Sequence, residues 1–336
     1  MNGRIIWLDN VRAVACVLVV VLHTVTLYAI AFDKSGVQWN IANIIDSFSR
    51  ICVPLFFMIS GFIFMQNKDI KTKNILKVLA NLILYTLIAA IYLVVFKSKS
   101  LESVLSPGIF FNSFEKPLFY HLWFFYKLLI CYFIFSLISI KSISSIKFLL
   151  IALVIFTVFN PTTSNFTSQF FGVSYGGILT INDPLIFYIL YGAFGASIGT
   201  MDIKPNRAYL YLSLFILFSL LTAAFTYSIS AANGRYNSSY YSYTALFVML
   251  ASVFLFSFIK SKGNEFNVFG PATKYIATAS LPIYGIHAFI LEWLLDARID
   301  QYISPFGFPI TFIIVFVPSL AFGLLLAKVD RKHIFS

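Results

Sequence analysis

Residues 11–30 read VRAVACVLVVVLHTVTLYAI, a stretch that is apolar apart from Arg12, His23 and three hydroxyl side chains. As an α-helix, a stretch of this length spans about 30 Å, the thickness of the hydrocarbon core of a bilayer. Arg12 and His23 are eleven residues apart, so they lie on one face of that helix, about 16 Å apart along its axis. An imidazole inside a membrane span indicates an ion path, a proton relay or a reactive site more often than a structural accident.

The composition of the whole chain supports a membrane location. Of its 336 residues 60% are hydrophobic and 11% are charged, and the mean hydropathy is +0.87. Ordinary soluble domains have about 45–50% apolar and 25% charged residues, so we predict an all-α polytopic membrane protein. The net charge of +11 fits basic cytoplasmic loops better than nucleic-acid binding. Cys16, Cys52 and Cys131 lack metal-ligand spacing, so we expect buried packing residues and no metal site.

Apolar stretches bounded by charged or turn residues predict about ten transmembrane helices. We expect the first to be retained, since no cleavage site of small residues follows it. No internal repeat and no soluble appendage are visible, so residues 1–336 are interpreted as a single transmembrane domain. The predicted spans are 11–30, 41–64, 75–96, 119–140, 146–160, 184–200, 208–230, 240–259, 275–295 and 307–327.

An even number of spans places both termini on one side, and the basic residues predict that this side is the cytoplasm. The opposite loops then hold only six basic residues, and the longest of them, 161–183, is a polar segment that either shapes an acceptor site or is a solvated connection. Sixteen of the 24 basic residues fall on the cytoplasmic side, namely Arg4, Arg12, Lys68, Lys71, Lys73, Lys77, Lys141, Lys147, Lys204, Arg207, Lys260, Lys262, Lys274, Lys328, Arg331 and Lys332.

Charged side chains at the predicted cytoplasmic edge are candidates for anion binding. Asp9 lies over the same helical face as Arg12, where its carboxylate is able to hold the guanidinium in place. A fixed arginine there suits phosphate recognition, although Arg12 also fits simple snorkelling to lipid headgroups. Lys73 and Lys77 share one helical face and are typical of a positive-inside cluster, which also suits the phosphates of an anionic cofactor.

The second apolar stretch contains Arg50, followed by VPLFFMISGF at residues 53–62. Pro54 and the Ser60–Gly61 pair predict a weakened helix, whose freed backbone groups must face protein or a polar cavity. The alternative is that Gly61 only allows another helix to approach closely.

Two further histidines lie near the ends of later spans. His121 opens the fourth span within YHLWFF at residues 120–125, beside Trp123, an aromatic residue typical of a membrane interface. Ser280, Tyr284 and His287 are spaced four and three residues apart, so they share one helical face. Such a stripe is typical of a lined cavity and is also compatible with an interhelical hydrogen-bond ladder.

Together these motifs resemble the membrane-bound acyltransferase-3 family. Its members carry an Arg and a His separated by ten residues in the first helix, a VPLFF-x-ISGF string in the second, an HLWF string and a late S-x-x-x-Y-x-x-H stripe. Within the family, the chain is most similar to members that acetylate enterobacterial common antigen, followed by O-antigen acetylases. Ala13 departs from the usual Gly, and Lys73 and Lys77 stand where arginine is usual, which alone forms a bidentate fork with phosphate.

The resemblance implies an O-acetyltransferase of the bacterial inner membrane. It implies transfer of an acetyl group from cytoplasmic acetyl-CoA to a hydroxyl of a surface glycan or of its undecaprenyl-linked precursor, within the lipid bilayer and beside envelope glycan assembly proteins. The residues expected to act are Arg12, Lys73, Lys77 and Asp9 on the cofactor, His23, Ser60, His121 and His287 in catalysis, and Arg50, Trp123, Ser280 and Tyr284 on the acceptor.

The residues leave two mechanisms and two other protein classes open. An imidazole, with a pKa of about 6.5, is able to act as a general base on the acceptor hydroxyl or to carry the acetyl group itself. Ser60 and Gly61 are candidates for oxyanion donors, and His121 and His287 for orienting His23 or the acceptor. Composition alone also fits a proton-coupled transporter, although two matching halves with interrupted segments are not visible, or a non-catalytic scaffold.

Overall fold

The computed structural model describes residues 4–65, 72–104, 106, 116–138, 148–149, 151–152, 155, 159–173, 181, 183–299 and 307–330. Within these ranges all regular elements are helices, which confirms the all-α prediction. Seven are long and apolar enough to cross a membrane, or eight if one bent pair counts as a span, and Pro184–Thr200 is a shorter apolar helix. The span predicted at 146–160 lies mostly outside the described residues.

Contacts divide the chain into two compact units. The first unit is Met1–Asp69 with Ile134–Thr273, and the second is Ile70–Phe133 with Lys274–Ser336. Cys16, Cys52 and Cys131 are buried and none of the three forms a disulfide, as expected of packing residues.

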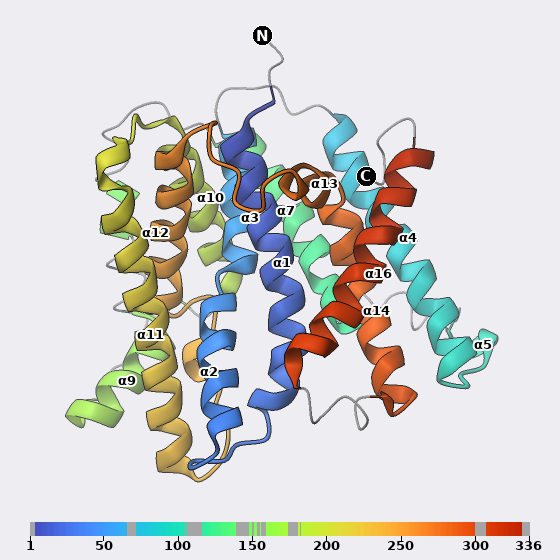
Figure 1. The fold of residues 1–336 in the computed structure, drawn as a ribbon, viewed down its shortest axis with the longest axis horizontal. Helices are drawn as coiled ribbons and strands as arrows, with labels where there is room; N and C mark the ends of the chain where they lie inside the picture. The colour runs from blue at the N-terminus through green and yellow to red at the C-terminus, as the bar shows by residue number, and fades with distance from the viewer. Residues whose placement is uncertain are drawn as a thin grey trace. The chain divides into compact units, whose positions relative to one another are not determined.

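The first unit is a helical bundle built around α1. In it α1 packs against α2 and α3, α3 against α10, and α11 against both α2 and α12 (Figure 1). Its helices are α1 (Ile6–Ala29), α2 (Val37–Ser49), α3 (Cys52–Phe64), α9 (Pro161–Phe171), α10 (Pro184–Thr200), η2 (Pro205–Arg207), α11 (Ala208–Asn233), η3 (Ser239–Tyr241) and α12 (Leu246–Lys262).

The helix of the second predicted span is interrupted, but the interruption lies before Pro54 and not at it. α2 ends at Ser49 and α3 begins at Cys52, so the break falls on Arg50 and Ile51. Pro54 is the third residue of α3, where its missing N–H removes no intrahelical hydrogen bond. The predicted break at Ser60–Gly61 is wrong, since α3 continues to Phe64.

Close packing between α3 and α10 explains Gly61. A Cβ atom at Gly61 would overlap the backbone carbonyl of Gly192, and a Cβ atom at Gly195 would overlap that of Met58. Small residues let membrane helices approach until their backbones touch. The alternative interpretation of Gly61, close helix approach, is therefore confirmed.

The polar segment that follows residue 160 is partly helical rather than an open connection. Asn160 caps α9 by accepting a hydrogen bond from the Thr162 N–H at 2.7 Å, and Pro161 occupies the first helical position. Gly172 ends the helix with a φ of +67°, a left-handed conformation that glycine adopts without strain. Cap residues, and not hydrophobic periodicity, were the signal for this helix.

The second unit contains α14, which packs against α4 and α16. α13 and α14 meet at a bend of 76°, so the ninth predicted span is not one straight helix. Large apolar side chains remain exposed on α4 and α16, including Ile91 and Leu325, as expected of surfaces that face lipid. The helices are α4 (Thr72–Phe96), α5 (Leu101–Val104), η1 (Tyr120–Leu122), most of α7 (Trp123–Leu137), most of α13 (Ala272–Thr278), α14 (Ser280–Asp296) and α16 (Phe308–Val329).

Candidate active site

An acid and two arginines meet at the N-terminal end of α1. Arg12 Nη1 donates to Asp9 Oδ1 at 3.3 Å, which confirms the contact predicted between these two residues. Arg4 Nε also donates to Asp9, through the other carboxylate oxygen. Asp9 is buried whereas Arg12 is half-buried, so one carboxylate orients two guanidinium groups and leaves Arg12 partly accessible.

The same end of the first unit carries lysines from α12. Lys260 Nζ lies 4.7 Å from the centre of the Trp7 ring, and Lys262 Nζ lies 4.6 Å from that of Tyr209. These cation–π contacts place basic groups from α12 beside the first turn of α1 and the first turn of α11. The end of the unit that holds Arg12 is therefore strongly basic, as anion binding requires.

The segment after α12 fixes the first turns of α1. Asn10 Oδ1 accepts from the Val268 N–H at 2.9 Å, and Asn10 Nδ2 donates to the Phe266 carbonyl. The Trp7 N–H donates to Asn264 Oδ1 at 3.3 Å. Asn10 was not identified from the sequence, although a buried asparagine in a helix beside an arginine is a usable signal.

His23 lies on the same helix as Arg12, which runs without interruption from Ile6 to Ala29 as predicted. Its side chain is half-buried. One turn further along, Thr26 Oγ1 donates to the Leu22 carbonyl at 2.7 Å and lies 3.4 Å from Asp46 Oδ2 of α2. Because residues three apart on a helix are neighbours, the side of α1 near His23 faces the polar end of α2.

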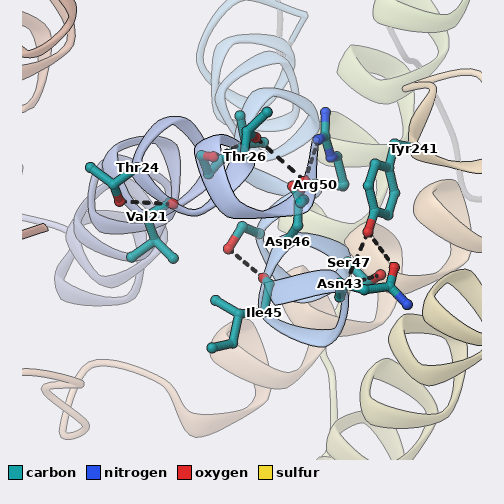
Figure 2. Close-up of polar contacts among 12 residues, drawn as sticks. Val21, Thr24, Thr26, Asn43, Ile45, Asp46, Ser47, Arg50 and Tyr241 are labelled. Carbon is teal, nitrogen blue, oxygen red and sulfur yellow. Dashed lines mark hydrogen bonds and ion pairs between the residues drawn. The ribbon is translucent and has the colours of Figure 1, made fainter. Parts of the chain in front are cut away.

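Arg50 and Asp46 form a buried ion pair where α2 ends. Arg50 Nη2 donates to Asp46 Oδ2 at 2.7 Å, and the guanidinium carbon lies 4.2 Å from the centre of the Tyr241 ring. Figure 2 shows the Tyr241 hydroxyl directed at Asn43, to which it donates a hydrogen bond, while Asn43 Nδ2 donates to the Ala223 carbonyl at 2.9 Å. The sequence motifs predict a role for Arg50 but not for Asp46, Asn43 or Tyr241.

Ser60 does not have the environment predicted for it. Its hydroxyl donates to the Phe56 carbonyl at 2.9 Å, one turn earlier in α3. The peptide groups of Ser60 and Gly61 belong to a continuous helix. A helix break that frees backbone donors for an oxyanion is therefore absent at this point of α3.

In the second unit, His121 and His287 come together with Tyr284. The two imidazole rings lie 5.5 Å apart between centres, and the Tyr284 hydroxyl donates to the His121 carbonyl at 2.7 Å. This hydrogen bond joins η1 to α14, which is compatible with the interhelical hydrogen bonds predicted as one alternative for this stripe.

The hydrogen bonds of these histidines fix their tautomers. His121 Nε2 lies 3.0 Å from the Gly285 carbonyl, and His287 Nδ1 lies 2.8 Å from the Tyr284 carbonyl. A carbonyl only accepts, so these two nitrogens carry the protons. In the neutral rings, His121 Nδ1 and His287 Nε2 then present lone pairs, which is the form required of a base.

The remaining candidates also belong to the second unit. Lys73 is exposed and Lys77 half-buried in the first turns of α4, on one helical face as predicted. Ser280 begins α14 and donates to the Ala277 carbonyl at 2.9 Å, across the bend. Trp123 is half-buried at the start of α7. Their roles as cofactor or acceptor ligands stay predictions.

Comparison with known proteins identifies the family. Residues 5–328 match the acyltransferase domain that defines the acyltransferase-3 family. No curated protein and no solved structure gives a significant match. The domain covers nearly the whole chain and includes Arg12, His23, Arg50, His121 and His287. This chain, a multi-pass membrane protein, belongs to the acyltransferase-3 family and is an acyltransferase rather than a transporter.

Proposed function

We propose that this acyltransferase transfers an acetyl group from cytoplasmic acetyl-CoA to a hydroxyl of a surface glycan or its undecaprenyl-linked precursor, in a bacterial inner membrane. The observation that carries the proposal is the placement of Arg12 and His23 on one unbroken helix within the matched domain. Enterobacterial common antigen is the favoured acceptor and O-antigen the next, because the sequence motifs are most similar to those of enzymes with these acceptors.

The basic end of the first unit supports an anionic donor. Asp9 orients Arg12, and the lysines of α12 add positive charge beside it. Phosphate groups of acetyl-CoA would bind there, while the thioester extends toward His23. Lys73 and Lys77 are further candidate phosphate ligands on the basis of the family resemblance alone.

His23 would perform the chemistry in one of two ways. As a general base it takes the proton of the acceptor hydroxyl, the oxygen attacks the thioester carbonyl carbon, the carbon–sulfur bond breaks, and the proton passes to the CoA thiolate. As a carrier its nitrogen attacks first and releases CoA thiol, and the acceptor oxygen then displaces the acetyl group from the imidazole. The roles expected for His121, His287, Ser280, Tyr284 and Trp123 in orienting the acceptor rest on the family resemblance.

An apolar cavity supports a lipid-linked acceptor. A cavity of about 140 Å³ lies between α9 and the N-terminal end of α12, lined by residues that include Phe166, Tyr240 and Phe247. It belongs to the end of the first unit opposite Arg12, because α12 ends beside α1 at Lys260. Hydrocarbon from an undecaprenyl chain would remove this apolar surface from water.

The decisive experiment compares the wild type with His23→Ala in membranes supplied with radiolabelled acetyl-CoA and in cells whose surface glycans are measured by mass spectrometry. We expect the variant to insert and express normally while the label no longer enters glycan and the glycan loses the mass of its acetyl groups. Acetylation retained by His23→Ala would remove this residue from the chemistry.

The two routes through His23 differ when the acceptor is withheld. The carrier route predicts a labelled acetyl group on the protein that hydroxylamine removes and that His23→Ala lacks. The general-base route predicts no labelled protein and CoA release only when glycan is present.

A further inference from the structure

Asp46 and Arg50 form an ion pair buried in the second apolar stretch, where α2 ends. Asp46 is fully buried, and the Arg50 side chain is only 13% exposed. Ionisable side chains are costly inside a membrane span, where they usually mark a functional site. Replacing a buried ion pair with apolar residues is often neutral or stabilising, so the need to join α2 to α3 does not by itself account for the pair.

The ion pair leaves one donor and one acceptor unused. The Nε–H and the neighbouring Nη2–H of an arginine point in the same direction, so a carboxylate is able to accept both in parallel. Here only Arg50 Nη2 contacts Asp46, through Oδ2. Arg50 Nε and Asp46 Oδ1 are buried and have no hydrogen-bond partner among the residues that the structure describes. Each of these atoms is two bonds away from the contacting atom of its own side chain, so both belong to the immediate surroundings of the ion pair.

The chemistry of these two atoms selects a hydroxyl group. A hydroxyl accepts from Arg50 Nε–H and donates to Asp46 Oδ1 at the same time. A cation would be attracted to Asp46 and repelled by Arg50, and an anion would meet the reverse, so an ion satisfies only one of the two atoms. Leaving a buried polar atom without a hydrogen bond costs free energy, which favours a ligand that pairs both.

A tyrosine from the segment between α11 and α12 packs against Arg50. The Tyr241 ring packs against the guanidinium, held by its hydrogen bond to Asn43, as Figure 2 shows. The ring of Tyr236, from the same segment, lies 6.3 Å from that of Tyr241 between centres. Rings beside a charged, hydrogen-bonding pair suit a sugar, whose C–H faces pack on aromatic surfaces while its hydroxyls take hydrogen bonds.

The position along the bundle fits an acceptor. Thr26, one turn beyond His23, contacts Asp46 Oδ2, so the ion pair lies beside the part of α1 that carries the imidazole. The tyrosine segment joins α11 to α12 at the end of the unit opposite Arg12 and the basic cluster. A ligand held by Arg50 and Tyr241 would therefore approach His23 from the side away from the donor phosphates.

We propose that Asp46 and Arg50 bind a hydroxyl of the acceptor sugar, and that Tyr241 forms one wall of this acceptor site. The inference rests on the proposed glycan acylation and adds to it a binding residue, Asp46, and the hydroxyl class of ligand that it recognises.

The test compares Asp46→Asn, Arg50→Gln and the double variant Asp46→Asn/Arg50→Gln with the wild type. The double variant is included because each single change leaves a buried charge without its partner, which threatens folding. Initial rates with radiolabelled acetyl-CoA are measured against the concentration of a glycolipid fraction extracted from the producing bacterium, and separately against acetyl-CoA. We expect the apparent KM for glycolipid to rise at least tenfold while that for acetyl-CoA stays within twofold.

The matched control removes another ion pair, between Lys97 and Asp296 of the second unit, whose nitrogen and oxygen lie 2.5 Å apart. The variant Lys97→Gln/Asp296→Asn should keep both KM values. The inference is overturned if a folded Asp46/Arg50 double variant keeps the wild-type KM for glycolipid. That result would show that the two side chains bind only water. The inference is also overturned if both KM values rise together with a lower melting temperature. A wild type that transfers no label would instead refute the proposed function.

Discussion

At the scale of single residues, the phosphate-binding role proposed for Arg12 is tested by measuring the KM for acetyl-CoA, because arginine and lysine bind phosphate differently. Its guanidinium is oriented by Asp9 and able to bind phosphate through two parallel hydrogen bonds. Arg12→Gln removes charge-assisted hydrogen bonds worth about 1.5–3 kcal/mol, so we expect a KM for acetyl-CoA roughly ten- to hundredfold higher. Arg12→Lys keeps the charge and should give an intermediate value. Unchanged saturation by acetyl-CoA in both variants would contradict a phosphate role.

His121 allows its structural and chemical contributions to be separated. Glutamine carries an N–H group at nearly the distance of imidazole Nε2, so His121→Gln is able to keep the bond to the Gly285 carbonyl. We expect this variant to retain its melting temperature in detergent and to lose turnover by a factor of roughly 10², as for the misplacement of a reacting group. His121→Phe serves as the comparison that loses the hydrogen bond as well. Normal turnover in His121→Gln would show that His121 contributes only its hydrogen bond to Gly285 and has no part in the reaction.

At the scale of elements, the pairing of α3 with α10 depends on glycine at the crossing. Gly61→Ala or Gly195→Ala would drive a methyl group into the backbone of the other helix, which does not yield as a flexible side chain would. We expect a loss of roughly 1–3 kcal/mol or more, seen as a lower melting temperature of the purified protein. Leu217→Ala, at an exposed position of α11, is the matched control. A Gly61→Ala protein as stable as this control would show that the helices separate easily.

The elements also show what hydropathy detects. Long apolar runs predicted α1, α4, α11 and α16, because each such helix must satisfy its backbone internally and expose apolar side chains to lipid. The interruption in the second span lies at a different position from the one predicted. Pro54 does not interrupt α3 because it lies in the first turn, and Gly61 allows close packing against α10. The contact between Arg50 and Tyr241 was not predicted, because the two residues are 191 positions apart. Periodicity shows which residues share a face of one helix, but it does not show which distant residues pack against that face.

At the scale of the whole molecule, the distribution of basic residues predicts that both termini are cytoplasmic. The pair Asn206→Cys and Asn233→Cys tests this directly. Both positions are exposed and flank α11, whose 26 residues span about 39 Å, so they lie on opposite sides of the membrane. The native cysteines are buried and should give little background. In intact spheroplasts we expect a membrane-impermeant maleimide to label position 233 and to reach position 206 only after permeabilisation. The reverse pattern would invert the topology and place Arg12 on the side away from acetyl-CoA.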